Sequence, residues 1–131
     1  MQKFLGLDVG TTRIGVAFAD TNIKIAYPIS TIEAGDAAAA SIASLLRMKG
    51  ATAIVVGLPR NASGQETAQS EYTRQFAEQL TSLGIPVHFQ DESLTSILAE
   101  ERLKERGKPY EKSDIDAEAA TIILQDYINQ L

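Results

Sequence analysis

The hydrophobic positions of this chain fall into short extended runs, separated by stretches with helical spacing. The extended runs are rich in apolar and β-branched residues, and turn residues follow several of them, which predicts strands. Pro28 lies inside the third run and marks an edge strand or a bulge there. We expect strands at Lys3–Val9, Arg13–Ala19, Lys24–Glu33, Thr52–Gly57 and Ile85–Gln90.

The intervening stretches repeat apolar residues every three or four positions, which is typical of helices that bury one face. Polar residues at their starts and glycines at their ends mark the predicted boundaries. We expect one helix between Asp36, as its N-cap, and Gly50, one from Ala68 to Gly84, one opened by Asp91-Glu92-Ser93 and running to about Arg106, and a last one from Asp114 to about Gln130, capped by Ser113.

Three strands in succession, followed by alternating helices and strands, predict a mixed sheet joined by right-handed parallel crossovers. We therefore expect an α/β fold: a three-strand antiparallel meander plus parallel strands makes five, flanked by helices, with residues 1–131 forming one domain. Functional groups in such sheets gather at the carboxyl ends of the parallel strands. Asp8 and the pair Asp91-Glu92 lie at such ends.

Composition restricts the possible chemistry of this protein more than it restricts the possible folds. The 131 residues include no cysteine and one histidine, His88, which excludes disulfides, thiolate or histidine-rich metal sites and cysteine nucleophiles. A metal site would be built mainly from carboxylates, which favour Mg²⁺, Mn²⁺ or Ca²⁺. The 12 basic and 17 acidic residues give a net charge of −5, which disfavours non-specific nucleic-acid binding but not a metal-dependent enzyme. Without a long apolar run or a signal-peptide pattern, we expect a cytoplasmic protein that neither spans nor binds a membrane.

Two aspartates stand at positions where an unpaired carboxylate is costly. Asp8 lies inside an apolar run, where it either caps the turn through the amides of Gly10–Thr12 or takes part in a site. Asp116 begins a helix face that continues with Ile123, so that it borders the predicted core. Its alternative role is a capping box with Ser113.

A third carboxylate, Asp91 or Glu92, ends the last strand, where it also suits the start of a helix. If it converges with Asp8 and Asp116 at one end of the sheet, the mutual repulsion requires a cation. Two Mg²⁺ or Mn²⁺ ions about 3.5–4 Å apart would activate a water and stabilise the leaving oxygen of a phosphodiester. The residues alone therefore favour metal-dependent phosphodiester hydrolysis.

Two basic segments are candidates for phosphate contacts. The segment Gly57–Gly64 connects a strand to a helix, and its amides together with Arg60 suit a phosphate, although an ordinary connection is the simpler interpretation. Lys108 and Lys112 lie in a basic stretch and would guide nucleic acid, with Tyr110 stacking on a base. The arginines of that stretch alternate with glutamates, which favours a solvent-exposed helix face with ion pairs four residues apart.

Four motifs, in order along nearly the whole chain, resemble those of the YqgF family, the Holliday-junction-resolvase-like proteins also described as pre-16S rRNA nucleases. The resemblance implies a ribonuclease H-like fold, a bacterial cytosolic setting, a role in maturing the 5′ end of 16S rRNA and a divalent-metal nuclease site. The motifs are Gly6–Ala17, Val56-Gly57-Leu58-Pro59 with Gly64, Asp91–Ser96, and Asp116 with Ala119-Ala120 and Ile122–Gln125.

By motif position, the acidic residues of the implied site would be Asp8, Glu92 and Asp116. Ser93 stands where the family usually has an arginine. Another group, Arg60 or Arg13, would then take over phosphate binding.

The resulting hypothesis is that a metal-activated water hydrolyses a nucleic-acid phosphodiester and leaves a 5′-phosphate. Asp8 would bridge Mg²⁺ or Mn²⁺ ions, with Glu92 and Asp116 as further ligands, and basic residues would contact the nucleic acid: Arg13, Arg60, Lys108 and Lys112. Precursor 16S rRNA, alone or in a pre-ribosomal particle, is the expected substrate. The alternatives are a ribosome assembly factor with weak or no catalysis, a resolvase that cuts DNA junctions as a homodimer rather than a monomer, and a phosphotransferase, whose fold needs two such lobes.

Overall fold

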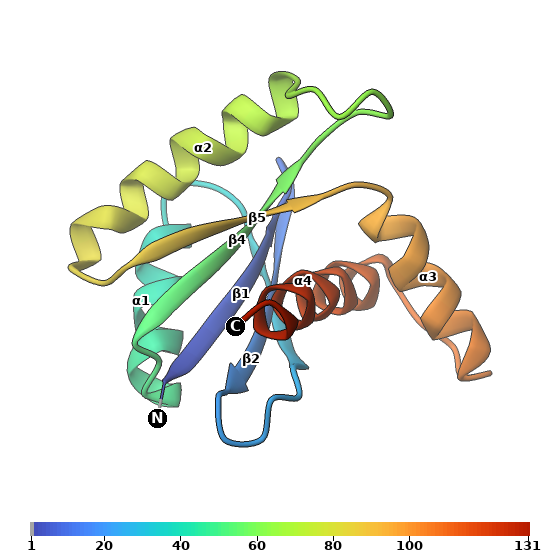
Figure 1. Cartoon of the computed structure of the whole chain (residues 1–131), viewed down its shortest axis with the longest axis horizontal. Coiled ribbons are helices and arrows are strands. Elements are labelled where there is room, and N and C mark those ends of the chain that lie inside the picture. Colours follow the sequence, from blue (N-terminus) through green and yellow to red (C-terminus); the bar gives the residue numbers. More distant parts are fainter. Residues whose placement is uncertain (1) are drawn as a thin grey trace.

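The computed structural model describes residues 2–131 and contains a five-stranded sheet in the order β3-β2-β1-β4-β5 (Figure 1). β1 pairs with β2, and β2 with β3, in antiparallel fashion, whereas β4 and β5 continue the sheet parallel to β1. The predicted α/β architecture is therefore confirmed. The strands span Lys3–Val9 (β1), Arg13–Asp20 (β2), Tyr27–Glu33 (β3), Ala53–Pro59 (β4) and Val87–Glu92 (β5).

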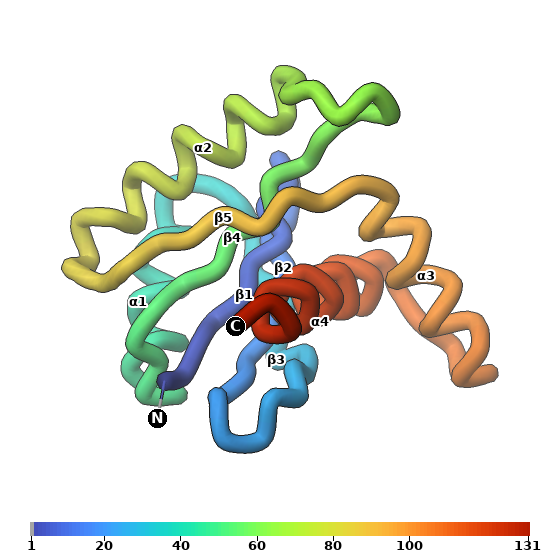
Figure 2. Tube along the Cα trace, viewed as in Figure 1, coloured from blue at the N-terminus to red at the C-terminus, as the bar shows by residue number. Residues whose placement is uncertain are grey.

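Helices cover both faces of the sheet. α1 and α2 pack on one face and α4 on the other, while α3 leaves the end of β5 and packs against α4 (Figure 2). Within residues 2–131, no helix has the length and apolar character that crossing a membrane requires. The helices span Ala38–Lys49 (α1), Ala68–Leu80 (α2), Thr95–Glu105 (α3) and Lys112–Asn129 (α4), with a 3₁₀ turn at Thr81–Leu83 after α2.

The two faces of the sheet differ in side-chain size. The face toward α1 and α2 carries large apolar side chains that form the main core, among them Leu5, Leu7, Ile14, Ile54 and Val56. The face toward α4 carries mostly small residues, among them Gly6, Gly15, Ala17, Ala53 and Gly57. Because there is little side-chain volume between them, α4 lies closer to the strands than a face of ordinary core residues would allow.

Glycines make this close approach possible. A Cβ placed at Gly15 of β2 would lie 1.9 Å from the carbonyl oxygen of Asp116, and one at Gly6 of β1 would lie 2.6 Å from Cβ of Leu124. Any larger residue at these positions would push α4 away from the sheet. The glycines therefore determine where α4, and with it Asp116, lies.

The strand bounds differ from prediction in ways that have simple causes. β3 starts at Tyr27 rather than at Lys24, because Lys24 adopts a left-handed turn conformation with φ of 62°. The irregularity predicted at Pro28 is confirmed, since the register of β2 and β3 shifts beside it. β5 continues to Glu92 instead of ending at Gln90, which fixes the direction of the Glu92 side chain by strand alternation.

The predicted helix ends at Gly50 and Gly84 are confirmed, since both glycines adopt the left-handed conformation that closes a helix. Two predicted starts are wrong by small shifts. α1 begins at Ala38 with Ala37, not Asp36, in the N-cap position. α3 begins at Thr95, because Asp91 and Glu92 still belong to β5 and Ser93 lies in the bend that follows it.

The predicted N-cap of α4 is also wrong. The helix begins at Lys112, one residue before Ser113, and its cap forms around Glu111. The Glu111 amide donates to the carboxylate of Asp114 at 2.9 Å. The Ser113 carbonyl instead accepts a hydrogen bond of 2.6 Å from the hydroxyl of Thr31 in β3. This bond anchors the first turn of α4 to the sheet.

We predict that Gly15→Ala lowers the free energy of unfolding by more than the roughly 1–3 kcal/mol typical of overpacking. The added Cβ would meet a helix carbonyl, which cannot rotate away as a side chain can. Urea and thermal unfolding would measure the loss. Gly84→Ala is the matched control, because φ is +79° there but nothing lies within 4 Å, so only a backbone cost of about 1–2 kcal/mol applies. Equal losses in the two variants would contradict the close packing of α4.

Candidate active site at the carboxyl ends of the strands

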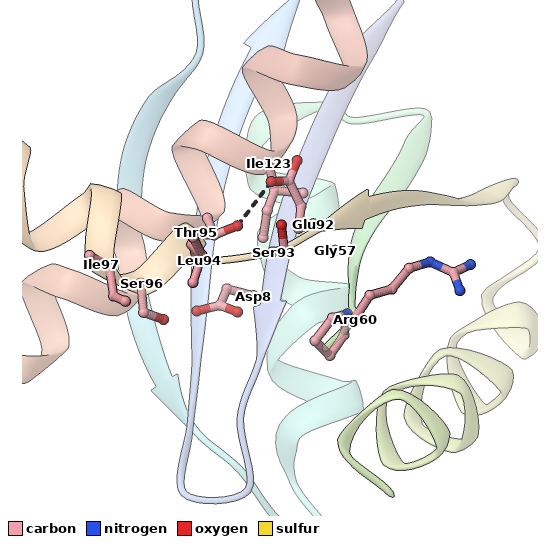
Figure 3. A pocket seen from close by; sticks show the side chains of 11 residues that line it. Asp8, Gly57, Arg60, Glu92, Ser93, Leu94, Thr95, Ser96, Ile97 and Ile123 are labelled. Carbon is pink, nitrogen blue, oxygen red and sulfur yellow. Dashed lines mark hydrogen bonds between the residues drawn. The ribbon is translucent and has the colours of Figure 1, made fainter. Parts of the chain in front are cut away.

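A groove runs across the carboxyl ends of β1, β4 and β5. One hollow in it is lined by Asp8, Glu92 and Leu94, with Ile123 of α4 at its base (Figure 3). A second hollow shares Asp8 and extends over the β1–β2 turn to Asp116. The groove therefore passes all three of the predicted acidic residues.

Asp8 is the carboxylate at the end of β1. It lies opposite Gly15 in the β1–β2 register, so that its side chain is half-buried beneath the start of α4. Burial and, secondarily, the charge of Asp116 raise the pKa of the Asp8 carboxyl to about 6. Among residues 2–131 no donor hydrogen-bonds to this carboxylate, and the Gly10 amide donates to the Arg13 carbonyl at 2.9 Å. The turn-capping alternative is therefore wrong.

Asp116 projects from α4 toward Asp8. It is the fifth residue of the helix, so that it lies beyond the first turn, in which the helix dipole favours a carboxylate. Its Oδ2 instead accepts a hydrogen bond from Nε of Arg13 at 2.5 Å, and 19% of its side chain is exposed. The ion pair with Arg13 replaces the expected capping box with Ser113.

Glu92, and not Asp91, shares a face of the sheet with Asp8. Paired residues of parallel strands point to the same side, and Glu92 pairs with Pro59, two residues after Gly57 on the α4 face. The neighbouring Asp91 therefore points to the opposite side. Its side chain is 63% exposed and pairs with Nε of Arg60 at 3.1 Å. Strand alternation thus separates two carboxylates that are adjacent in the sequence.

The Glu92 side chain turns toward α4 and away from Asp8 (Figure 3). Its Oε2 accepts a hydrogen bond of 2.9 Å from the Thr95 hydroxyl, while its buried Oε1 has no hydrogen-bond partner among the described residues. Burial raises the pKa of the Glu92 carboxyl to about 8, and the carboxylate of Asp126 in α4 contributes. Sequence reasoning missed Asp126, although it lies three residues after Ile123 and so borders the same helix face.

The arrangement brings two of the three predicted carboxylates together. Asp8 and Asp116 face each other closely enough to perturb the Asp8 pKa, whereas Glu92 lies beside them with its carboxylate turned away. In the part of the chain that the structure describes, no three acidic or histidine side chains are grouped so as to hold a metal ion. The site is therefore a carboxylate pair with a third carboxylate next to it.

The arginines predicted to contact phosphate lie at different distances from the Asp8–Asp116 pair. Arg13 is within it, through its bond to Asp116. Arg60 extends away from Asp8 in Figure 3 and bonds to the carbonyl of Gly64 at 3.2 Å as well as to Asp91. Arg60 thus belongs to the outer end of the groove, in the loop between β4 and α2.

The basic stretch, which runs from α3 into the α3–α4 loop, is only partly the solvent-exposed helix face that we expected. Arg102 and Arg106 fold onto Glu118 of α4, with N–O distances of 3.5 and 2.8 Å, although Glu118 is only 1% exposed. Lys108 and Lys112 are exposed, in the α3–α4 loop and at the first residue of α4. The Tyr110 hydroxyl donates to Glu100 at 2.8 Å.

Comparison with known proteins gives the family. The family RuvX, described as Holliday junction resolvase, matches residues 2–130. A protein of Chloroflexus aurantiacus named "Putative pre-16S rRNA nuclease" is 45% identical over 98% of this chain and 87% of its own length. Proteins of the same name from Anaeromyxobacter sp. and Moorella thermoacetica are each 42% identical, over 97% and 98% of this chain and 96% of their own lengths.

Solved structures confirm the predicted ribonuclease H-like fold. Thermus thermophilus RuvC in complex with a Holliday junction substrate has a TM-score of 0.61 at 16% identity and covers 99% of this chain and 95% of its own. Fowlpox virus resolvase with junction DNA has a TM-score of 0.55 at 10% identity and covers 98% of each chain. The chain therefore belongs to the RuvX family, described as Holliday junction resolvases, the same family that its motifs resemble under the name YqgF, and it is a nuclease.

Proposed function

We propose that this protein is a divalent-metal nuclease that hydrolyses phosphodiester bonds of precursor 16S rRNA in the cytoplasm, with Asp8, Asp116 and Glu92 as its acidic residues. The observation that carries the proposal is the Asp8–Asp116 pair. Two carboxylates repel each other at the carboxyl end of the central strand, and Asp8 receives no hydrogen bond from the described residues that would offset its burial. A fold retains such an arrangement at a cost, which a bound cation would offset.

The donor set fits a hard cation. Carboxylate oxygens are the ligands that Mg²⁺ and Mn²⁺ accept, and Asp8 with Asp116 would hold the first ion. Glu92 would be a further ligand once it releases Thr95, since one of its oxygens is already without a partner. When bound, the metal supplies an activated water and neutralises charge on the phosphate.

The chain's own cations would position the nucleic acid. Arg13 already orients Asp116, and its guanidinium retains donors that a phosphate would engage. Arg60 at the outer end of the groove, with Lys108 and Lys112 beyond α3, would contact neighbouring phosphates of the strand. These contacts would hold the scissile phosphate over Asp8 against the net charge of −5.

The names of the relatives favour rRNA, alone or within a pre-ribosomal particle, as the substrate. Junction DNA is the second candidate, supported by the likeness to resolvases solved with Holliday junctions. Symmetric cutting of a junction would require a homodimer, whereas a monomer suffices for a single strand. A ribosome assembly factor with weak or no cleavage of these substrates is the remaining alternative, and the following experiments distinguish it.

Asp8→Asn and Asp116→Asn are each expected to lower cleavage of a 5′-extended 16S precursor fragment by more than about 100-fold, since partners one step further from a metal already contribute 10–100-fold. Removing a ligand charge weakens metal binding without changing side-chain shape. The assay compares Mn²⁺, Mg²⁺ and EDTA, with junction DNA as a parallel substrate and circular dichroism as the folding control. Metal-dependent cutting that persists in both variants, or no cutting by the folded wild type, would refute the proposed site.

Without metal, Asp8→Asn is expected to stabilise the protein, by on the order of 1 kcal/mol. The substitution removes a charge that burial and Asp116 disfavour. Added Mn²⁺ should raise the melting temperature of the wild type and not that of the variant, because only the wild type gains binding energy in the folded state. Glu78→Gln, an exposed carboxylate change near the C-terminal end of α2, is the control. Equal Mn²⁺ shifts in wild type and Asp8→Asn would contradict metal binding at Asp8.

Glu92→Gln should lower the rate of cleavage far more than Asp91→Asn does, although the two residues are adjacent. Only Glu92 lies on the face of Asp8, whereas Asp91 points to the other side. Initial rates at saturating Mn²⁺ would measure both variants, and we expect Asp91→Asn to stay within a few-fold of wild type. The reverse order of losses would assign the third ligand to Asp91.

A further inference from the structure

Leu94 combines two features that are unfavourable for folding. Its backbone is left-handed, with φ of 58° and ψ of 16°, a conformation that glycine or asparagine adopts far more readily than a bulky side chain. Its side chain is 69% exposed to solvent. A buried leucine would compensate for backbone strain by hydrophobic burial, but Leu94 obtains little of this compensation. Strained residues of this kind are concentrated at functional sites.

The position of Leu94 connects it with the groove. It follows β5 and immediately precedes α3, so that it stands over the carboxyl end of the sheet. It lines the hollow that contains Asp8 and Glu92, and it also lines the neighbouring hollow around Arg60. Leu94 thus forms a ridge that borders both hollows, and Figure 3 places it beside Asp8, on the side away from Arg60.

A second exposed apolar residue extends this ridge. Ile97 is 56% exposed and lines the same hollow as Asp8, one helical turn along α3. Leu94 and Ile97 therefore present an apolar wall directly beside carboxylates that would hold a metal and a phosphate. In a nucleotide the base lies next to its phosphate, and the flat face of a base is the apolar surface that such a wall would contact.

We infer that Leu94, supported by Ile97, is an apolar wedge that separates the two bases flanking the phosphate cleaved at Asp8. Leucine and isoleucine wedges unstack neighbouring bases and kink the strand, which exposes the backbone between them. The strand would run past Leu94 and over Asp8 toward Arg60, so that the two bases lie on opposite sides of the Leu94 side chain. This inference rests on the proposed nuclease function and adds a preference for strand segments that unstack readily.

A second copy of this chain is the other candidate occupant of the apolar wall, and continuity with the groove argues against it. Leu94 lines both hollows, so that a protein packed on it would cover the hollow that contains Asp8 and Arg60. A nucleic-acid strand would instead fill both hollows while it covers Leu94. We therefore assign the wall to the substrate.

The test uses the full chain and 5′-extended 16S precursor fragments that carry 2-aminopurine at successive positions, with binding measured in EDTA. Unstacking raises the fluorescence of this base analogue, so that wedge insertion is read without cleavage. We expect wild type to raise it at one or two adjacent positions. Leu94→Gly and Leu94→Ala should both reduce this rise several-fold, and Leu94→Gly should also melt at a higher temperature because glycine relieves the left-handed strain. Ile23→Ala, at an exposed residue at the opposite end of the sheet, should leave the signal unchanged.

Several outcomes would overturn the wedge. One is a wild-type complex with no fluorescence rise at any position, even if cleavage occurs. Another is an undiminished rise in both Leu94 variants. A third is a loss of dimers in the Leu94 variants by light scattering with unchanged fluorescence, which would assign the wall to a second copy. A Leu94-dependent rise in a protein that never cleaves would support the wedge and refute only the nuclease proposal.

Discussion

The close contact between α4 and the glycine-bearing face of the sheet is the constraint on which the site depends. A helix separated from the strands by ordinary side chains would hold Asp116 too far from Asp8 for either carboxylate to affect the other. Gly15 lies opposite Asp8 in the neighbouring strand. It has no side chain that would hold the backbone of Asp116 away from the sheet. Gly57 does the same on the other side of Asp8, where a Cβ would lie 2.4 Å from Cδ1 of Ile123. Glycines that look like weak points in strands are therefore what brings the acidic pair together.

The electrostatics of the groove follow from this contact. The repulsion between Asp8 and Asp116 is only partly balanced, because Arg13 pairs with Asp116 and no cation of residues 2–131 pairs with Asp8. The Glu92 side chain points away from the pair and accepts a hydrogen bond from Thr95. In that position burial and the carboxylate of Asp126 raise its pKa. The surroundings of each carboxylate thus compensate its charge only in part. This is expected of groups that are selected for binding a charged ligand rather than for stability.

Local patterns determined how much of this could be predicted from the sequence. Apolar runs and turn residues located all five strands. The contrast between the large and small residues of the two sheet faces became evident only in the folded structure. Three helix starts were misplaced. The extension of β5 depends on its pairing with β4, which a single sequence does not specify. The cap of α4 is local, but it uses Glu111 instead of Ser113, the residue type that capping preferences favour. The same limit applies to the site. The position of Asp8 could be predicted from its apolar surroundings, but the bond from Arg13 to Asp116 joins residues 103 positions apart and requires the folded sheet.

The attachment of α3 explains how an exposed ridge can have a fixed position. α3 does not touch the main core. It is held against α4 by a small apolar contact of Ala99 with Ala119 and Ile122, and by Arg102 and Arg106 on the buried carboxylate of Glu118. Moving α3 away from α4 would leave the buried Glu118 charge uncompensated, which resists any other placement of α3. Since α4 is itself fixed by the glycines of the sheet, the same packing that places Asp116 also sets the direction in which α3 leaves the end of β5. Leu94 lies at that junction, so that its left-handed backbone is imposed from both sides: β5 holds it on the sheet, and α3 is drawn toward α4.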